Sequence, residues 1–202
     1  VALCLAGKVE IGDIDRGDCL VEPSLDQLSQ RLDVQLTLLS DAPTALKHLL
    51  PAKLYIGARR VSAKIALIEN GISSLAPGHT SMVQLILDSP ISAYSSERFV
   101  LRDDSESFLL GGGVILDPIG PQFGKAKPER LARLRALSTG SVDTALRHLL
   151  ASNVTTNWPD LARTFHLKRE SAVPTLPDMA VKFDLKQSTW ITTRSAIAAA
   201  KQ

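Results

Sequence analysis

Cysteines are scarce in this 202-residue sequence, and long apolar runs are missing from it. The two cysteines, Cys4 and Cys19, have neither CxxC spacing nor a histidine beside them, so we expect buried, reduced thiols and no zinc site. No run of about eighteen apolar residues occurs, and the chain therefore offers no candidate membrane helix. No signal peptide is recognisable at Val1, where a strand-like stretch begins as if entered midway. These absences predict a cytoplasmic fragment of a longer protein.

Catalytic and nucleotide-binding motifs are missing as well. No HExxH, GxSxG or GxxxxGK[ST] pattern occurs, and the segment DPIG at 117–120 fits only a loose DxxG, which we interpret as chance. The four histidines are scattered, and we expect them to lie in packing or surface positions: His48, His79, His148 and His166. The sequence therefore predicts a fragment that is not an enzyme and that binds no metal or nucleotide of its own.

Charge is distributed unevenly along the chain. Residues 1–119 hold 10 Lys and Arg against 15 Asp and Glu, a net −5, whereas residues 120–202 hold 13 against 6, a net +7. A change of sign at one point indicates a domain boundary, and a basic second half favours an anionic partner such as nucleic acid. A solvated basic face is the other interpretation.

The first half of the chain has the pattern of β-structure. RLDVQLTLL places Leu32, Val34, Leu36 and Leu38 on one face, which is the period of a half-buried strand. Further strands are expected at VALCLAG, GDCLVEP, KLYIG, RVSAKIALIE, MVQLILD, RFVLRD and GGGVILDP, with breaks at Pro43, Pro51, ENG, APGH, DSP and DDSES. Several short strands separated by Gly, Pro and Asp turns predict a β-barrel or sandwich.

The second half has a helical pattern. After an exposed linker, GPQFGKAKP, a helix is expected from Pro128, a second from about Ser141, and a third from about Trp158 to His166 with Asn157 as its cap. Two strands, MAVKFDL and STWITT, and an alanine-rich helix follow. Three helices and a hairpin in this order predict a winged helix-turn-helix domain.

The stretch RFVLRDDSESFLLGGG, residues 98–113, carries the clearest functional signal. Arg98 and Arg102 face one side of a strand, and Phe99 and Leu101 face the other. Three consecutive glycines then indicate a bulge or a close backbone approach. Two interpretations stand: a barrel strand whose arginines pair with Asp103 or Glu97, or a strand whose arginines meet phosphates while the glycines admit a sugar-phosphate edge.

Other arginines are grouped as well. Arg59 and Arg60 are adjacent on an expected strand, so only one of them can turn inward, and a solvated face is the favoured interpretation. Arginines of the expected helices form a basic stripe that we interpret as a solvent-exposed face: Arg130, Arg133, Arg135 and Arg147.

Four segments, in this order, resemble one family. They are LAGKVEIGDIDRGDCLVEP, KLYIGARRVSAKIALIE, RFVLRDDSESFLLGGGVILDP and KAKPERLARLRAL, and with them nearly all of the chain resembles the bacterial selenocysteine-specific elongation factors. The resemblance implies an elongation-factor-Tu-like β-barrel followed by a winged helix. Residues 1–23 would end a second barrel domain, 24–118 would form the third domain, also a barrel, 119–127 a linker and 128–202 the first winged helix. GTP and Mg²⁺ would bind to a domain upstream of this fragment.

The same resemblance implies the partners and the site. Members of the family deliver selenocysteinyl-tRNA to the ribosome at a recoded stop codon, guided by an mRNA hairpin that winged helices beyond Gln202 would read. The winged helix here would be a spacer, and the protein a monomer without a membrane contact. The resemblance implies Arg102, Asp103, Asp104 and Ser105 as candidate contacts to the RNA backbone, and the residue patterns described above add Arg59, Arg98, Gly111 and Gly112 as further RNA-binding candidates.

Two departures from the family pattern remove possible contacts. Phe108-Leu109 stands where many members have Arg-Thr, and Ser89 stands where related tRNA carriers have a basic residue. Two other hypotheses remain open. One is a winged-helix DNA-binding regulator that would use Arg163, Lys168 and Arg169, and the other is a pair of structural modules without a ligand.

Overall fold

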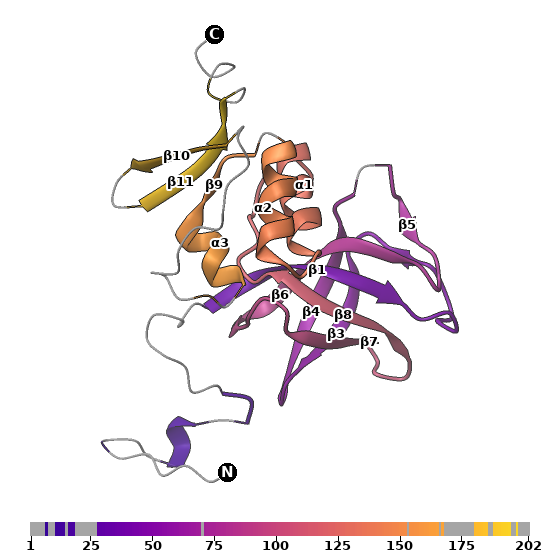
Figure 1. Ribbon diagram of the computed structural model, residues 1–202. Helices are drawn as coiled ribbons and strands as arrows, with labels where there is room; N and C mark the ends of the chain where they lie inside the picture. Colours follow the sequence, from indigo (N-terminus) through magenta and orange to yellow (C-terminus); the bar gives the residue numbers. More distant parts are fainter. Residues whose placement is uncertain are drawn as a thin grey trace.

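A closed antiparallel β-barrel occupies the first half of the chain (Figure 1). The computed structural model describes residues 7, 11–14, 16–18, 28–69, 71–152, 154–165, 167, 180–185, 188–194 and 197. Within residues 28–117, apart from residue 70, the barrel has six strands in the order β1-β6-β4-β3-β7-β8, and β8 pairs back with β1. The strands are β1 (Leu28–Leu38), β3 (Leu50–Ile56), β4 (Arg59–Leu67), β6 (Thr80–Ser92), β7 (Arg98–Asp103) and β8 (Leu109–Asp117).

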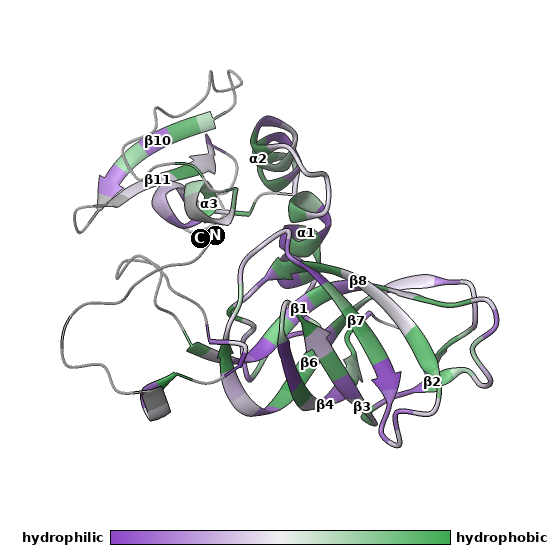
Figure 2. Cartoon of the chain, turned by 90° about the horizontal axis from the view of Figure 1, so that it is seen from below, coloured by the Kyte–Doolittle hydropathy of each residue, from purple (hydrophilic) through white to green (hydrophobic). Residues whose placement is uncertain are grey.

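Alternating side chains fill the barrel interior. Along β1, Leu32, Val34, Leu36 and Leu38 are all buried, which confirms the strand predicted from their spacing. The hydropathy colours alternate along the barrel strands in Figure 2, because successive side chains on a strand point to opposite faces. The inward set from all six strands forms one continuous apolar core.

Two of the predicted chain breaks were wrong. Pro51 lies inside β3, where it faces outward opposite Lys64 of β4. The segment Asp88–Pro90 lies inside β6, which continues to Ser92. Two short strands were not predicted, β2 (Leu46–Lys47) and β5 (Ser74–Leu75), which pair only with each other. The expected strands VALCLAG and GDCLVEP, together with both cysteines, lie largely or wholly outside the described residues; before β1, the element described is a short 3₁₀ helix, η1 (Ile11–Asp13).

The three glycines of β8 lie where neighbouring strands come very close. A Cβ on Gly111 would overlap the carbonyl oxygen of Thr37, and one on Gly113 would overlap that of Gln35. A Cβ on Gly112 would lie 2.7 Å from the carbonyl oxygen of Phe99 on the other side. The close approach that the glycine run predicted is therefore between β8 and its two neighbours, β1 and β7. Barrel closure by itself accounts for glycine at these positions.

Three helices and a small sheet follow the barrel among the described residues. They are α1 (Pro128–Leu137), α2 (Val142–Ala151), α3 (Trp158–Thr164), β9 (Thr156–Asn157), β10 (Ala180–Leu185) and β11 (Ser188–Thr193). We call these elements the helical unit. Its antiparallel sheet has the order β10-β11-β9. The helix starts at Pro128, Val142 and Trp158 agree with the predicted ones, and the Asn157 cap is confirmed because its side-chain oxygen accepts a hydrogen bond from the Asp160 amide at 3.2 Å.

A second apolar core joins the helical unit to the outside of the barrel. Ile68, Met82 and Leu116 of the barrel pack in one buried cluster with Leu131, Leu134, Leu149 and other residues of the helical unit. Met82 lies between the inward-facing positions of β6, so it points out of the barrel. The helical unit therefore covers one side of the barrel, as Figure 1 shows.

We predict that Gly113→Ala lowers the free energy of unfolding by about 1–3 kcal/mol or more, because a methyl group there forces β8 away from the backbone of β1. Gly12→Ala is the matched control, since nothing lies within 4 Å of a Cβ at Gly12. Urea unfolding followed by circular dichroism measures both. Equal stability of the two variants would contradict the proposed reason for the glycine run.

Candidate functional site

The outer face of β7 is cationic, as predicted. Phe99 and Leu101 point into the core and are 3% and 0% exposed, whereas Arg98 and Val100 are exposed and Arg102 is half-buried. The alternation follows from the period of the strand. Arg98 and Arg102 therefore lie on the same outward face.

Neighbouring strands extend this face. Lys53 of β3 is directly opposite Arg102, and on its other side Lys53 is opposite Ser62 of β4. Tyr55 is opposite both Arg60 and Val100. We define the basic strand face as the outward cations of β4, β3 and β7: Lys53, Arg60, Lys64, Arg98 and Arg102. Sequence analysis missed Lys53 and Lys64, because only strand pairing shows that Lys53 lies opposite Arg102 and that Lys64 lies on the next strand, opposite Pro51.

Arg102 has an unused hydrogen-bond donor on this face. Its Nε atom is buried and has no hydrogen-bond partner among the described residues. Arg102 also has no ion pair with Asp103 or Glu97 in the described part of the chain. Such a pair was expected if residues 98–113 form only an ordinary barrel strand. A buried donor without an acceptor is costly, and the charge of this guanidinium group is not balanced by an ion pair among the described residues.

The turn from β7 to β8 is built around the Asp103 carboxylate. The carboxylate accepts hydrogen bonds from the Ser105 hydroxyl and from the amides of Ser105 and Phe108. These donors, the Ser105 hydroxyl first, lower the pKa of Asp103 below its ordinary value. Asp103 therefore has a structural role in the turn, and its ionised form fixes the loop that was predicted to contact RNA.

Two other acids of the turn lie against the basic strand face. Asp104 forms an ion pair with Lys53 at 3.1 Å. Glu106, which has a positive φ of 60°, accepts hydrogen bonds from the Tyr55 hydroxyl at 2.6 Å and from Arg60 at 2.9 Å. The bond to Glu106 raises the pKa of Tyr55. The turn thus neutralises two cations and leaves Arg98, Arg102 and Lys64 without ion pairs among the described residues.

Arg59 lies in a cavity of about 480 Å³ at the β3–β4 hairpin. Three arginines line it, Arg16, Arg59 and Arg60, together with Tyr55 and the backbone of Gly57 and Ala58. Arg59 is paired with Asp18 at 2.5 Å. Gly17 packs against Arg59 so closely that a Cβ there would lie 2.9 Å from it, with φ at +99°. Two of the three arginines that line the cavity are already paired with carboxylates, Arg59 with Asp18 and Arg60 with Glu106.

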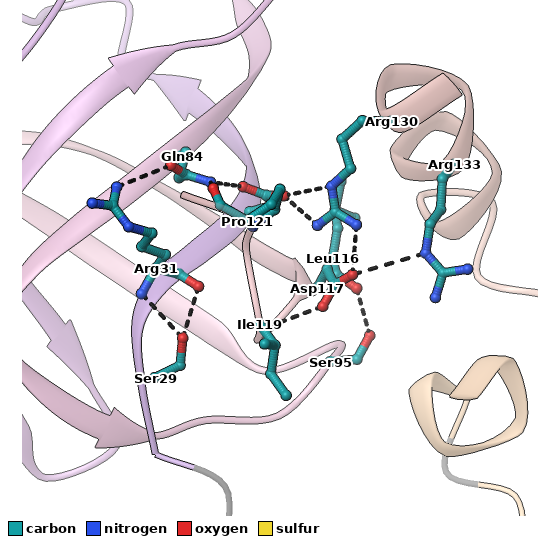
Figure 3. Close-up of polar contacts among 11 residues, drawn as sticks. Ser29, Arg31, Gln84, Ser95, Leu116, Asp117, Ile119, Pro121, Arg130 and Arg133 are labelled. Carbon is teal, nitrogen blue, oxygen red and sulfur yellow. Dashed lines mark hydrogen bonds and ion pairs between the residues drawn. The ribbon is translucent and has the colours of Figure 1, made fainter. Parts of the chain in front are cut away.

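A second polar cluster joins the barrel to α1 (Figure 3). Arg130 donates to the carboxylate of Asp33 through Nε, at 2.9 Å, and through Nη2. Its Nη1 donates to Asp117 at 2.9 Å. Gln84 donates to Asp33 at 2.8 Å and to the Pro121 carbonyl at 3.0 Å. We call these residues, with Arg133, the barrel–helix network.

The barrel–helix network corrects one prediction. Arg130 and Arg133 were expected on a solvent-exposed basic stripe, but their side chains are only 14% and 20% exposed. Arg135 and Arg147 are exposed, in agreement with the prediction. The helix turns its first two arginines toward the barrel because Asp33 and Asp117 lie there, outside the barrel interior and under α1.

Burial dominates the electrostatics of this network. It raises the pKa of Asp33 above its ordinary value, against the opposing effect of Arg130. Burial acts to lower the pKa of Arg130, but Asp117 and Asp33 outweigh it and raise that pKa. Arg133 has few partners, so burial lowers its pKa. Arg130 is consequently the charge on which both buried carboxylates depend.

The described residues contain no group of three His, Cys, Asp or Glu side chains that could hold a metal ion. His48 accepts a hydrogen bond from the Leu67 amide, which is a packing role. Within the same described part of the chain, no helix is long and apolar enough to cross a membrane.

Comparison of this sequence with known protein families identifies the closed antiparallel barrel. Residues 30–122, which include nearly the whole barrel, match the family model described as the β-barrel domain of selenocysteine-specific elongation factors. The barrel of this chain therefore belongs to the β-barrel domain family of selenocysteine-specific elongation factors.

Three curated relatives carry the same name. The chain is 30% identical over 145 residues to the selenocysteine-specific elongation factor of Escherichia coli K12, and 28% identical over 143 residues to that of Desulfomicrobium baculatum. It is 28% identical over 138 residues to that of Haemophilus influenzae. The alignments cover 68–71% of this chain, and they span only 21–22% of the relatives' length.

We predict that Arg130→Met lowers the free energy of unfolding by about 3–5 kcal/mol, because it leaves the fully buried Asp33 without a counter-charge and leaves Asp117 with Arg133 alone, at 3.9 Å. Asp33→Asn should cost much less, since the amide oxygen still accepts from Arg130 and the buried charge is removed. Arg135→Met, on the 61% exposed arginine of the same helix, is the control and should change stability by less than about 0.5 kcal/mol. Urea titration measures all three, and an Arg130→Met variant as stable as the control would disprove the role of the network.

The two perturbed carboxyl groups should respond to pH in opposite directions. Because the pKa of Asp33 is raised in the folded state, its contribution to the free energy of unfolding is full below its unfolded pKa, near 3.8. This contribution declines as pH rises through the folded pKa. Because the pKa of Asp103 is lowered in the folded state, its contribution to the free energy of unfolding is present above its unfolded pKa, about 3.8. This contribution declines as pH falls through the folded pKa. Between pH 3 and 6, the stability of wild type relative to Asp33→Asn should therefore fall with rising pH, and relative to Asp103→Asn it should increase. Parallel curves for the two variants would refute both assignments.

Proposed function

We propose that this chain is the part of a translation elongation factor that helps to deliver selenocysteinyl-tRNA to the ribosome for selenocysteine incorporation at recoded stop codons. Its barrel contacts the RNA backbone through the basic strand face. The unpartnered, buried Nε atom of Arg102 is the observation that carries this proposal. The family of the barrel and the names of its relatives support the choice of tRNA as the ligand.

The geometry suits a phosphate backbone. Arg98, Arg102 and Lys64 are cations on one face, and none of them has an ion pair among the described residues. The arginine-lined cavity at Arg59 offers a second anion position on the same β3–β4 hairpin. Asp104 and Ser105 lie on the turn beside this face, so their backbone groups can approach the same ligand. Gly111 and Gly112 stay part of the proposed contact only through their backbone, because close strand packing already explains their lack of side chains.

The helical unit completes the proposal. Three helices and a three-stranded antiparallel sheet support a winged helix, which we assign a spacer role between the barrel and further winged helices that read the mRNA hairpin. GTP and Mg²⁺ are assigned to a part of the parent protein outside this sequence, because the sequence has no GxxxxGK[ST] motif and the residues that the structure describes contain no cluster of metal ligands. The parent protein is proposed to be a cytoplasmic monomer.

We predict that Arg102→Ala weakens binding of labelled selenocysteine tRNA by roughly tenfold or more, because it removes a charge-assisted contact worth about 1.5–3 kcal/mol. The slope of log affinity against log salt should become shallower by about 0.9, for one lost phosphate contact. Fluorescence anisotropy at low salt measures both quantities. Arg147→Ala, an exposed arginine on α2, is the matched control.

Three results are distinguishable in this experiment. Loss of affinity in Arg102→Ala alone supports the basic strand face. Equal affinity of wild type and both variants means that Arg102 is an ordinary barrel charge. Tighter binding of duplex DNA than of tRNA would favour the winged-helix regulator instead.

A further inference from the structure

The loop between β8 and α1, residues 118–127, is anchored to the barrel at its start and ends in a hydrogen-bonded turn. The Gly120 amide donates to the Arg31 carbonyl at 2.7 Å, and Gln84 donates to the carbonyl of Pro121. A Cβ on Gly120 would lie within 3.1 Å of atoms of Gln84, Asp33 and Arg31, so the backbone fits tightly against the barrel. At the other end, the Lys127 amide donates to the Gly124 carbonyl at 3.1 Å. Figure 3 shows Ile119 and Pro121 beside the barrel–helix network.

Phe123 projects from this fixed loop. Its side chain is 83% exposed, more than any other large hydrophobic residue in the described part of the chain. Exposed aromatic rings on a segment of defined conformation are suited to binding, because the ring is presented without a large loss of chain entropy on association. The loop conformation therefore exposes an aromatic surface that no described residue covers.

The surroundings of Phe123 are cationic. Residues 118–128 contain no Asp or Glu, and they include Lys125 and Lys127. Gly124 has a φ of +73°, and the side chain of Lys127 lies over it, with Cδ and Cε 3.2 Å from where a Cβ would be. Neither lysine forms an ion pair within the described residues. The loop thus holds two free ammonium groups within four residues of an exposed ring.

We propose that this loop binds single-stranded RNA, with an unpaired base stacked on Phe123 and the adjacent phosphates near Lys125 and Lys127. A ring flanked by cations and free of acids matches the two features of a nucleotide, its π-face and its phosphate. Both lysines follow the ring within four residues of the sequence. This site lies outside the basic strand face. It rests on the proposed function in one respect, the choice of RNA as the class of partner.

Fluorescence anisotropy of the full 202-residue chain tests this site with two labelled probes, a short oligoadenylate and a fully paired RNA duplex. Phe123→Ala should weaken oligoadenylate binding about tenfold, the order expected for loss of one stacked base, and should not change duplex binding. Phe123→Trp should retain or increase affinity for the oligoadenylate. Lys125→Ala combined with Lys127→Ala should weaken both probes and make the salt dependence shallower.

Ile119→Ala is the matched control, because Ile119 is 50% exposed in the same loop and has no ring. Thermal unfolding should be unchanged in Phe123→Ala, since the ring makes little contact with the fold. Unchanged oligoadenylate affinity in Phe123→Ala, equal losses in Phe123→Ala and Ile119→Ala, or no oligoadenylate binding by the wild type would each overturn the proposal. Arg102→Ala should weaken binding of the RNA duplex, which tests the basic strand face separately. Failure of the basic strand face and failure of the Phe123 site therefore give different results.

Discussion

A buried arginine between two carboxylates connects the two halves of this molecule. Arg130 at the start of α1 is held by Asp33 on β1 and Asp117 at the end of β8. Desolvating three charges is costly, and their mutual attraction offsets that cost only while all three are in place. The apolar cluster around Met82 and Leu134 encloses the same contact. Because Asp117 ends β8, the position of α1 depends directly on how the barrel closes.

The barrel itself depends on an approach that only glycine allows. β8 passes between β1 and β7, and at Gly111, Gly112 and Gly113 it lies too close to their carbonyl groups for any side chain. This closeness lets β8 complete the ring of strands. The same strand then supplies Asp117 to the network, while its neighbour β7 presents Arg98 and Arg102 outward. One pair of adjacent strands, β7 and β8, thus closes the barrel, presents part of the proposed RNA face and attaches the helical unit.

Acidic side chains have three different roles in this basic neighbourhood. Asp103 organises the β7–β8 turn by accepting hydrogen bonds from the backbone. Asp104 and Glu106 hold Lys53 and Arg60, two of the cations on the basic strand face. Asp33, by contrast, is completely buried. Asp103 and Asp33 differ because hydrogen-bond donors in the turn stabilise the ionised carboxylate of Asp103, whereas burial at the barrel–helix junction penalises the ionised form of Asp33.

The sequence by itself determined the positions of the barrel strands though not all of their limits, the helix starts, and the direction in which Arg98 and Arg102 face, because these follow from local periodicity and from capping residues such as Asn157. It also determined that glycines 111–113 require a close approach, though not to which partner. Only the tertiary structure decided that Lys53 lies opposite Arg102, since strand pairing is not encoded in spacing along one strand. It likewise decided that Arg130 turns away from solvent toward Asp33, a residue 97 positions away. Interactions between distant segments depend on how the whole chain packs, and no local pattern contains that information.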